Sequence, residues 1–161
     1  MKEQIKEIRV NIDGLYQLTK ELKPMDCNNN NPGLKNTSKE IEDAAHSLIY
    51  AKAWLGKVLG ELGEETPYKN DGNRKDVKDI EPAADKEGFF LQDDWCEKNH
   101  IEKVDWLRQE IQSLIRDTDY ITSETGRVYI YGLRVEQYLS EARFALGFEL
   151  SRCKKEHENK R

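Results

Sequence analysis

The sequence predicts an all-α protein made of two antiparallel helical hairpins joined by a long loop. Two observations support this. Apolar residues recur at spacings of three and four in four segments, and clusters of Asn, Pro and Gly separate those segments. No segment keeps the strict alternation of a half-buried strand over a comparable stretch. We therefore expect a first hairpin at 1–63, a loop at 64–92 and a second hairpin at 93–161.

The first hairpin is predicted from two apolar stripes on either side of an Asn- and Pro-rich break. Residues 3–23 form its first helix. Thr37 and Ser38 are both suited to cap the N-terminus of a second helix. That helix should run to about Leu62, with Gly63 just beyond its end.

The second hairpin is predicted in the same way. A third helix is expected at about 93–121 and a fourth at about 127–156, with a turn at Thr125-Gly126 between them. The preceding segment, 64–92, shows no apolar period and contains two prolines, which is typical of a long loop.

The two hairpins also resemble each other. A shift of 91 positions places the Leu55-Gly56 pair on Leu146-Gly147 and aligns the apolar stripes of the second and fourth helices. Any two amphipathic helices can be aligned on their apolar period. Internal duplication and two unrelated hairpins therefore both remain open.

Composition argues against several functions. The net charge of −5 disfavours a nucleic-acid polymer as partner, because such binding depends on a basic surface. No apolar run approaches the roughly 20 residues of a membrane span, and the N-terminus lacks an apolar signal core. We expect no membrane association and a cytoplasmic location, which is the host cytoplasm if a phage encodes the protein. The three scattered cysteines predict neither a disulfide framework nor a CxxC metal site.

No motif in the sequence points to catalysis. A Gly-rich phosphate loop and a nucleophile elbow are both absent. His46, His100 and His157 are far apart and are expected at the surface or its rim. We expect no catalytic residue, no metal and no cofactor.

Two acidic pairs raise one enzymatic alternative, a magnesium-dependent nucleotide pyrophosphohydrolase. Glu40-x-x-Asp43 and Glu61-x-x-Glu64 flank the second helix. They are separated by about 30 Å at 1.5 Å per residue, too far to share one metal ion. Ordinary acids near the ends of a helix explain them better.

One flank of the second helix combines aromatic rings, a hydroxyl and a cation at helical spacing. Tyr50 and Trp54 could stack on a base, Ser47 could donate a hydrogen bond, and Lys57 could pair with a phosphate. Under the alternative interpretation, Trp54 belongs to the core and Lys57 is a solvated rim charge. The equivalent flank of the fourth helix contains Arg134, Tyr138, Glu141, Ala145 and Phe148.

The run AAHSLIYAKAWLGKVL at 44–59 and the loop segments TPYKNDGN at 66–73 and IEPAAD at 80–85 resemble a known family. They are similar to the helical hairpin of phage anti-CBASS and Thoeris anti-defence sponges, which sequester cyclic-nucleotide immune signals. The resemblance covers about residues 3–86. Trp54, Leu55 and Lys57 match the end of the family helix. The family's Arg-Thr pair falls near Ala45-His46, a departure that argues against cyclic-trinucleotide binding there.

The resemblance implies a protein that binds a cyclic nucleotide or a cyclic ADP-ribose-type molecule without cleaving it, between chains of a homo-oligomer. The ligand-binding residues expected from the flank and the resemblance are Lys57, Trp54, Tyr50, Ser47, His46, Lys6, Tyr16 and Lys69. The competing hypothesis is a helical protein–protein interaction or regulatory protein with no small-molecule site. A high charge content and a lean apolar fraction favour it.

Overall fold

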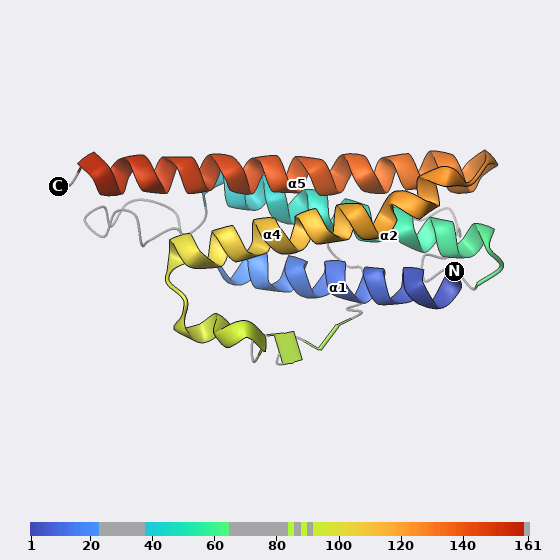
Figure 1. Cartoon of the computed structure of the whole chain (residues 1–161), viewed down its shortest axis with the longest axis horizontal. Helices are drawn as coiled ribbons and strands as arrows, with labels where there is room; N and C mark the ends of the chain where they lie inside the picture. The colour runs from blue at the N-terminus through green and yellow to red at the C-terminus, as the bar shows by residue number, and fades with distance from the viewer. Residues whose placement is uncertain (23–37, 65–83, 86–87, 90–91, 160–161) are drawn as a thin grey trace, which may run out of the picture.

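A computed structural model describes residues 1–22, 38–64, 84–85, 88–89 and 92–159. Within these ranges the chain is all-α, as predicted, and contains no strand. Four long helices pack together in Figure 1, and two short 3-10 helices, η3 and η4, flank α4. The elements are α1 (Lys2–Glu21), α2 (Lys39–Glu61), η3 (Gln92–Glu97), α4 (His100–Thr118), η4 (Asp119–Ser123) and α5 (Gly126–Asn159).

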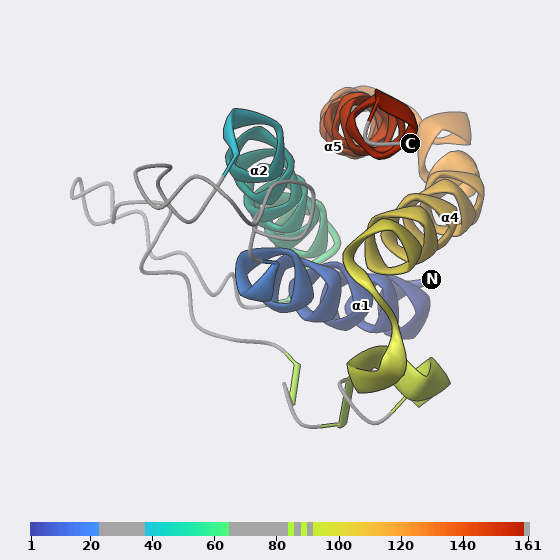
Figure 2. The ribbon, with the colours of Figure 1, turned by 90° about the vertical axis from the view of Figure 1, so that its left-hand side faces the viewer.

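The helices form a bundle in which each helix runs antiparallel to its neighbours. Helix α2 packs most extensively on α5, and the pairs α1–α2 and α4–α5 form the two hairpins (Figures 1 and 2). Helix α2 ends at the opposite end of the bundle from the start of α4 (Figure 1). Before α4, η3 lies outside α1 (Figure 2). No described helix combines the length and the apolarity needed to cross a bilayer.

One hydrophobic cluster joins all four helices. Ile12, Leu48, Leu107 and Leu139, one from each helix, are fully buried in it. Burying one such side chain contributes about 1.5–3 kcal/mol. The two predicted hairpins therefore share a single core, to which η3 adds Trp95.

The ends of α2 follow the predicted capping chemistry. Ser38 is the N-cap, and its hydroxyl accepts a hydrogen bond from the Ile41 amide at 3.1 Å. At the other end Gly63 adopts φ +92°, a conformation that suits glycine, and the Glu64 amide donates to the Leu59 carbonyl.

The predicted third helix begins too early. Residues 92–97 form a 3-10 helix, and α4 starts only at His100. Asn99 caps it, with its side chain accepting from the Glu102 amide at 2.9 Å. The spacing of apolar residues does not reveal this cap, because N-capping depends on a local hydrogen bond and not on periodicity.

A buried ion pair joins α1 to α2, and its carboxylate also contacts Ala84. Lys52 Nζ lies 2.8 Å from Asp13 Oδ1, and both side chains are almost fully buried. Asp13 Oδ2 also accepts from Gln17 and from the Ala84 amide. Next to it, Phe89 packs so closely on Gly14 that a β-carbon at position 14 would overlap the ring. Ala84 and Phe89 thus contact α1 at adjacent positions, Asp13 and Gly14.

Candidate functional site

Helices α2 and α5 meet along an antiparallel seam whose register is fixed by two contacts. The rings of Tyr50 and Tyr138 stack with centroids 5.3 Å apart, and Arg127 pairs with Glu61 at 3.5 Å. The two contacts are separated by the same number of residues on both helices. The flanks that the sequence presented as equivalent faces of two hairpins therefore face each other across this seam.

Toward the N-terminus of α2 the seam opens into a solvent-exposed groove of about 810 Å³, here called the α2–α5 groove. From the register of the seam, Asp43 lies level with Ala145 and Ser47 level with Glu141. Ser47 on α2 and Ala145 on α5 are short side chains that leave space between the two helices. The groove is lined by Lys39, Glu40, Asp43, His46, Ser47, Tyr50, Tyr138, Glu141, Phe144, Ala145, Phe148, Ser151, Arg152 and Lys155.

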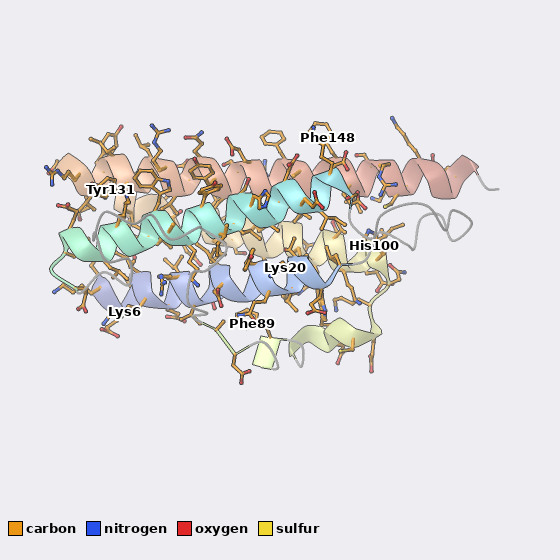
Figure 3. All side chains as sticks on the ribbon, turned by 180° about the vertical axis from the view of Figure 1, so that it is seen from behind. Lys6, Lys20, Phe89, His100, Tyr131 and Phe148 are labelled. Carbon is orange, nitrogen blue, oxygen red and sulfur yellow. The ribbon has the colours of Figure 1, made fainter. Side chains whose placement is uncertain are left out.

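Aromatic rings form part of the α5 wall of this groove. Phe144 and Phe148 are 61% and 67% exposed, unusually high fractions for phenylalanine, and they lie one helical turn apart. Figure 3 shows Phe148 on the outer edge of α5. With Tyr50 and Tyr138, these rings give the groove flat apolar surfaces suited to stacking.

Cations gather at one end of the groove. Lys39 stands in the first turn of α2, and Arg152 and Lys155 lie on the facing part of α5. The amide groups of a helix N-terminus add positive potential to this end. Glu40, Asp43 and Glu141 add negative charge, so the groove is not uniformly basic.

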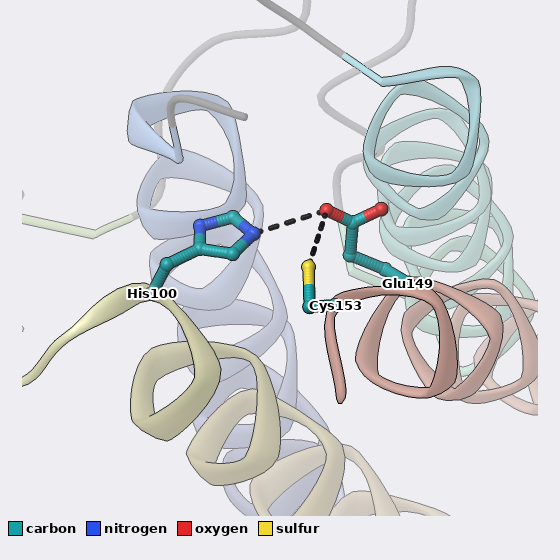
Figure 4. A group of neighbouring side chains, drawn as sticks. All are labelled: His100, Glu149 and Cys153. Carbon is teal, nitrogen blue, oxygen red and sulfur yellow. Dashed lines mark hydrogen bonds and ion pairs between the residues drawn. The ribbon is translucent and has the colours of Figure 1, made fainter. Parts of the chain in front are cut away.

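A buried carboxylate, Glu149, supports this end of the groove from beneath. It is fully buried and accepts hydrogen bonds from Ser38 at 3.0 Å, His100 at 3.0 Å and Arg152 at 2.7 Å (Figure 4 shows His100). Burial alone would raise the pKa of Glu149. The hydrogen bonds from His100, then from Arg152 and Ser38, outweigh that effect and hold the pKa below its ordinary value. One charged group thus joins the N-terminal ends of α2 and α4 to α5.

His100 and Cys153 correct two expectations from the sequence. His100 was expected at the surface, but only 3% of it is exposed, because its ring hydrogen-bonds to Glu149 within the bundle. Cys153 is disulfide-bonded, although the scattered cysteines predicted no disulfide framework. Residues that are far apart in the sequence can therefore lie close together in the folded chain.

The donor atoms of His100, Glu149 and Cys153 lie within 4.8 Å of one another (Figure 4). Such a trio could in principle bind a metal ion. The sulfur of Cys153 is in a disulfide bond and therefore cannot bind a metal as a thiolate. The Glu149 carboxylate already forms an ion pair with Arg152. The chemistry of this cluster fits a structural network better than a metal centre.

The structure brings together three of the residues proposed from the sequence. His46, Ser47 and Tyr50 all line the α2–α5 groove. Trp54 and Lys57 lie farther along the seam, outside the groove lining. The Trp54 ring packs on Tyr131 with centroids 5.4 Å apart, and Lys57 Nζ lies 4.7 Å from the centre of the indole.

The remaining proposed residues are not part of the groove. Lys6, on α1, pairs with Glu3 at 3.2 Å and with Glu64 at 3.5 Å, near the C-terminal end of α2. Glu3 first, and then Glu64, raise the pKa of Lys6. Tyr16, also on α1, packs partly buried against the core, with Lys20 over its ring. Lys69 lies outside the described residues.

The acidic pairs of the hydrolase alternative are far apart. Glu40 and Asp43 line the groove, whereas Glu61 pairs with Arg127 and Glu64 with Lys6 at the other end of α2. These four carboxylates do not converge on one position.

Sequence reasoning did not propose the groove residues of α5. Tyr138 and Phe148 were noted only as a matching flank, and Phe144, Arg152 and Lys155 were not singled out. One signal was available: Phe144 and Phe148 fall outside the apolar stripe of α5, so a large ring at either position predicts an exposed patch.

No protein-family model, curated protein or solved structure matches the chain.

Proposed function

We propose that the protein binds a cyclic nucleotide or a cyclic ADP-ribose-type molecule in the α2–α5 groove and sequesters it without cleavage. The observation that carries the proposal is the groove itself, where exposed rings lie beside a cluster of cations. A base would stack on the rings, and a phosphate would lie at the cationic end.

The size and chemistry of the groove support this class of ligand. Its volume of about 810 Å³ is within the range of roughly 300–1,000 Å³ that is typical of small-molecule sites. Phe144 and Phe148 offer stacking surfaces, and Lys39 and Lys155 offer charge-assisted contacts to phosphate. Ser47 and His46 add polar groups at the wall.

The proposed site lies on the same flank of α2 that the sequence suggested, but nearer the N-terminus of the helix. Tyr50, Ser47 and His46 stay in it. Trp54 and Lys57 are assigned to packing instead, because the Trp54 ring lies against Tyr131 and the ammonium of Lys57 lies over that ring pair. The resemblance of residues 44–59 to the sponge helix rests on Trp54, Leu55 and Lys57, which do not line the groove, so support for the proposed ligand comes from the rings and cations of the groove itself.

Sequestration is proposed over hydrolysis because, among the described residues, the one group of three side chains that converge as metal ligands (His100, Glu149 and Cys153) lies outside the groove lining. Glu149, the buried carboxylate beneath it, is fully engaged by Ser38, His100 and Arg152. Of the four carboxylates considered for magnesium, only Glu40 and Asp43 line the groove.

Incubation with a panel of cyclic dinucleotides, cyclic trinucleotides and cyclic ADP-ribose isomers tests the proposal. After unbound ligand is removed, heating the protein should release one of them chemically intact. Recovery of cleaved product would establish an enzyme instead, and no uptake of any compound would refute the proposed ligand class.

The second candidate is a protein-interaction module, and the exposed phenylalanines favour it. Rings that are more than half exposed are also typical of surfaces that bind another protein. The panel separates the candidates, because an interaction module would take up none of the small molecules.

A further inference from the structure

The outward face of α5 carries an apolar–polar–apolar stripe. Near its N-terminus Ile130 and Leu133 are 53% and 42% exposed, and toward its C-terminus the two exposed groups are Phe144 and Phe148. Helical spacing puts all four on the same side of α5. Within the described part of the chain, they are among the most exposed large apolar side chains.

The centre of the stripe is polar and carries opposite charges at its two ends. Arg134 donates to Gln137 Oε1 at 3.1 Å, and Gln137 Nε2 donates to Glu141 Oε1 at 3.2 Å. The positive group therefore adjoins the first apolar pair and the negative group adjoins the second.

We infer that a second copy of the chain docks on this stripe, with the two α5 helices antiparallel. Ile130 and Phe148 are equally distant in sequence from Leu139, and Leu133 and Phe144 are nearly so. A twofold axis at the level of Leu139, on the outward face of α5, therefore sets the first apolar pair of each copy against the second apolar pair of the other. Such a self-complementary patch is what a twofold dimer requires.

The charges select the antiparallel orientation. In that arrangement Arg134 lies within about one helical turn of Glu141 of the second copy, so opposite charges meet. A parallel arrangement would set each Arg134 beside the other Arg134 and each Glu141 beside the other Glu141. Repulsion of like charges disfavours it.

The dimer would complete the α2–α5 groove. Glu141, Phe144 and Phe148 belong both to the stripe and to the groove wall. The α5 helix of the second copy would thus form an outer wall for the open groove and bring its own Arg134 to the rim. This consequence rests on the proposed function, whereas the pairing of the helices does not.

Sedimentation velocity without ligand tests the pairing through two charge substitutions and their mixture. The wild-type chain should sediment at twice its mass of 18.8 kDa. Ile130→Lys alone and Phe148→Glu alone should each give monomers, because each buries a lone charge against an apolar group. An equimolar mixture should return to the dimer, because a mixed pair matches the lysine with the glutamate and leaves Phe148 on Ile130.

Val10→Glu, on the exposed face of α1, is the matched control and should leave the dimer intact. Circular dichroism confirms that each variant keeps its helices. A monomeric wild type, or single variants that remain dimeric, would overturn the inference. A mixture that stays monomeric would overturn the antiparallel register. None of these outcomes depends on the ligand panel, so the test of the dimer stays valid even if no cyclic nucleotide binds.

Discussion

The two ends of the α2–α5 seam are built from the same pair of helices and differ in what fills the space between them. At one end Trp54 and Tyr131 fill the seam with their rings, and Lys57 covers them. At the other end Ser47 and Ala145 are too small to fill it, and a groove remains. The short side chains of Ser47 and Ala145 therefore help to distinguish the groove from the packed end of the seam.

The open end also differs in how it is held together. Rings are in contact at the packed end, through Trp54 and Tyr131, and in the groove, through Tyr50 and Tyr138. Of the two ends, the groove is the one that lies beside the buried hydrogen-bond network of Glu149. This network joins α2, α4 and α5 at the end of the seam where short side chains leave space between α2 and α5. The following substitutions test this contrast.

The largest effect is expected from Glu149→Ala. It removes the acceptor shared by Ser38, His100 and Arg152, and breaking a buried charged pair in this way costs about 3–5 kcal/mol. Urea unfolding measures the loss. Glu158→Ala removes an exposed glutamate near the end of the same helix and should cost about 0.5 kcal/mol or less. Equal losses in the two variants would mean that the network does not support the bundle.

The same network predicts a dependence on pH. Because the pKa of Glu149 is lower in the folded chain than in the unfolded one, its stabilisation is complete above the unfolded pKa of about 4.3. It is lost as the pH falls through that value toward the folded pKa. The difference in unfolding free energy between wild type and Glu149→Gln should therefore shrink below about pH 4. A constant difference across the acid range would contradict the lowered pKa.

A smaller and more selective effect is expected from the two α2 aromatics. Trp54→Ala should lower stability by about 3 kcal/mol, because it removes a ring packed on Tyr131 and the core, and should leave ligand affinity unchanged. Tyr50 is 40% exposed, so Tyr50→Ala should cost only about 1 kcal/mol in stability but weaken ligand binding. Thermal unfolding and calorimetric titration of both variants measure the two effects. The reverse pattern would move the site to the packed end.

The smallest effect on the fold is expected from two lysines. Lys155→Glu reverses a charge at the groove and should weaken binding of a phosphorylated ligand about 10- to 100-fold, the value of a lost charge-assisted contact of about 1.5–3 kcal/mol. Lys57→Glu loses only a cation–π contact, about 0.5–1 kcal/mol of stability. Affinity that falls only in Lys57→Glu would restore the site expected from the sequence.

Much of the fold followed from local sequence signals. The apolar stripes located four helices, and Ser38 and Gly63 marked the ends of α2, because capping and periodicity are properties of short segments. The start of α4 was missed, because its N-cap is a side-chain hydrogen bond of Asn99, which the apolar period does not reveal.

The site was predictable only in part. Tyr50, Ser47 and His46 share one helix flank, so spacing brought them together. Phe148 comes from a helix far away in sequence, and only the antiparallel register of the seam brings it near them. The buried pairing of His100 with Glu149 was equally hidden, because it joins two helices whose relative position no local pattern specifies.

Mapping of amide chemical shifts during titration with the cyclic-nucleotide panel tests the central claim most directly. The shift changes show in one experiment whether a ligand binds at the open or at the packed end of the seam. The indole N–H of Trp54 serves as an internal marker of the packed end. A ligand bound in the groove should shift His46, Ser47, Tyr50 and Phe148 and leave the Trp54 indole unchanged. Shifts centred on Trp54 and Lys57, or no shifts with any compound, would contradict the assignment of function to the open end.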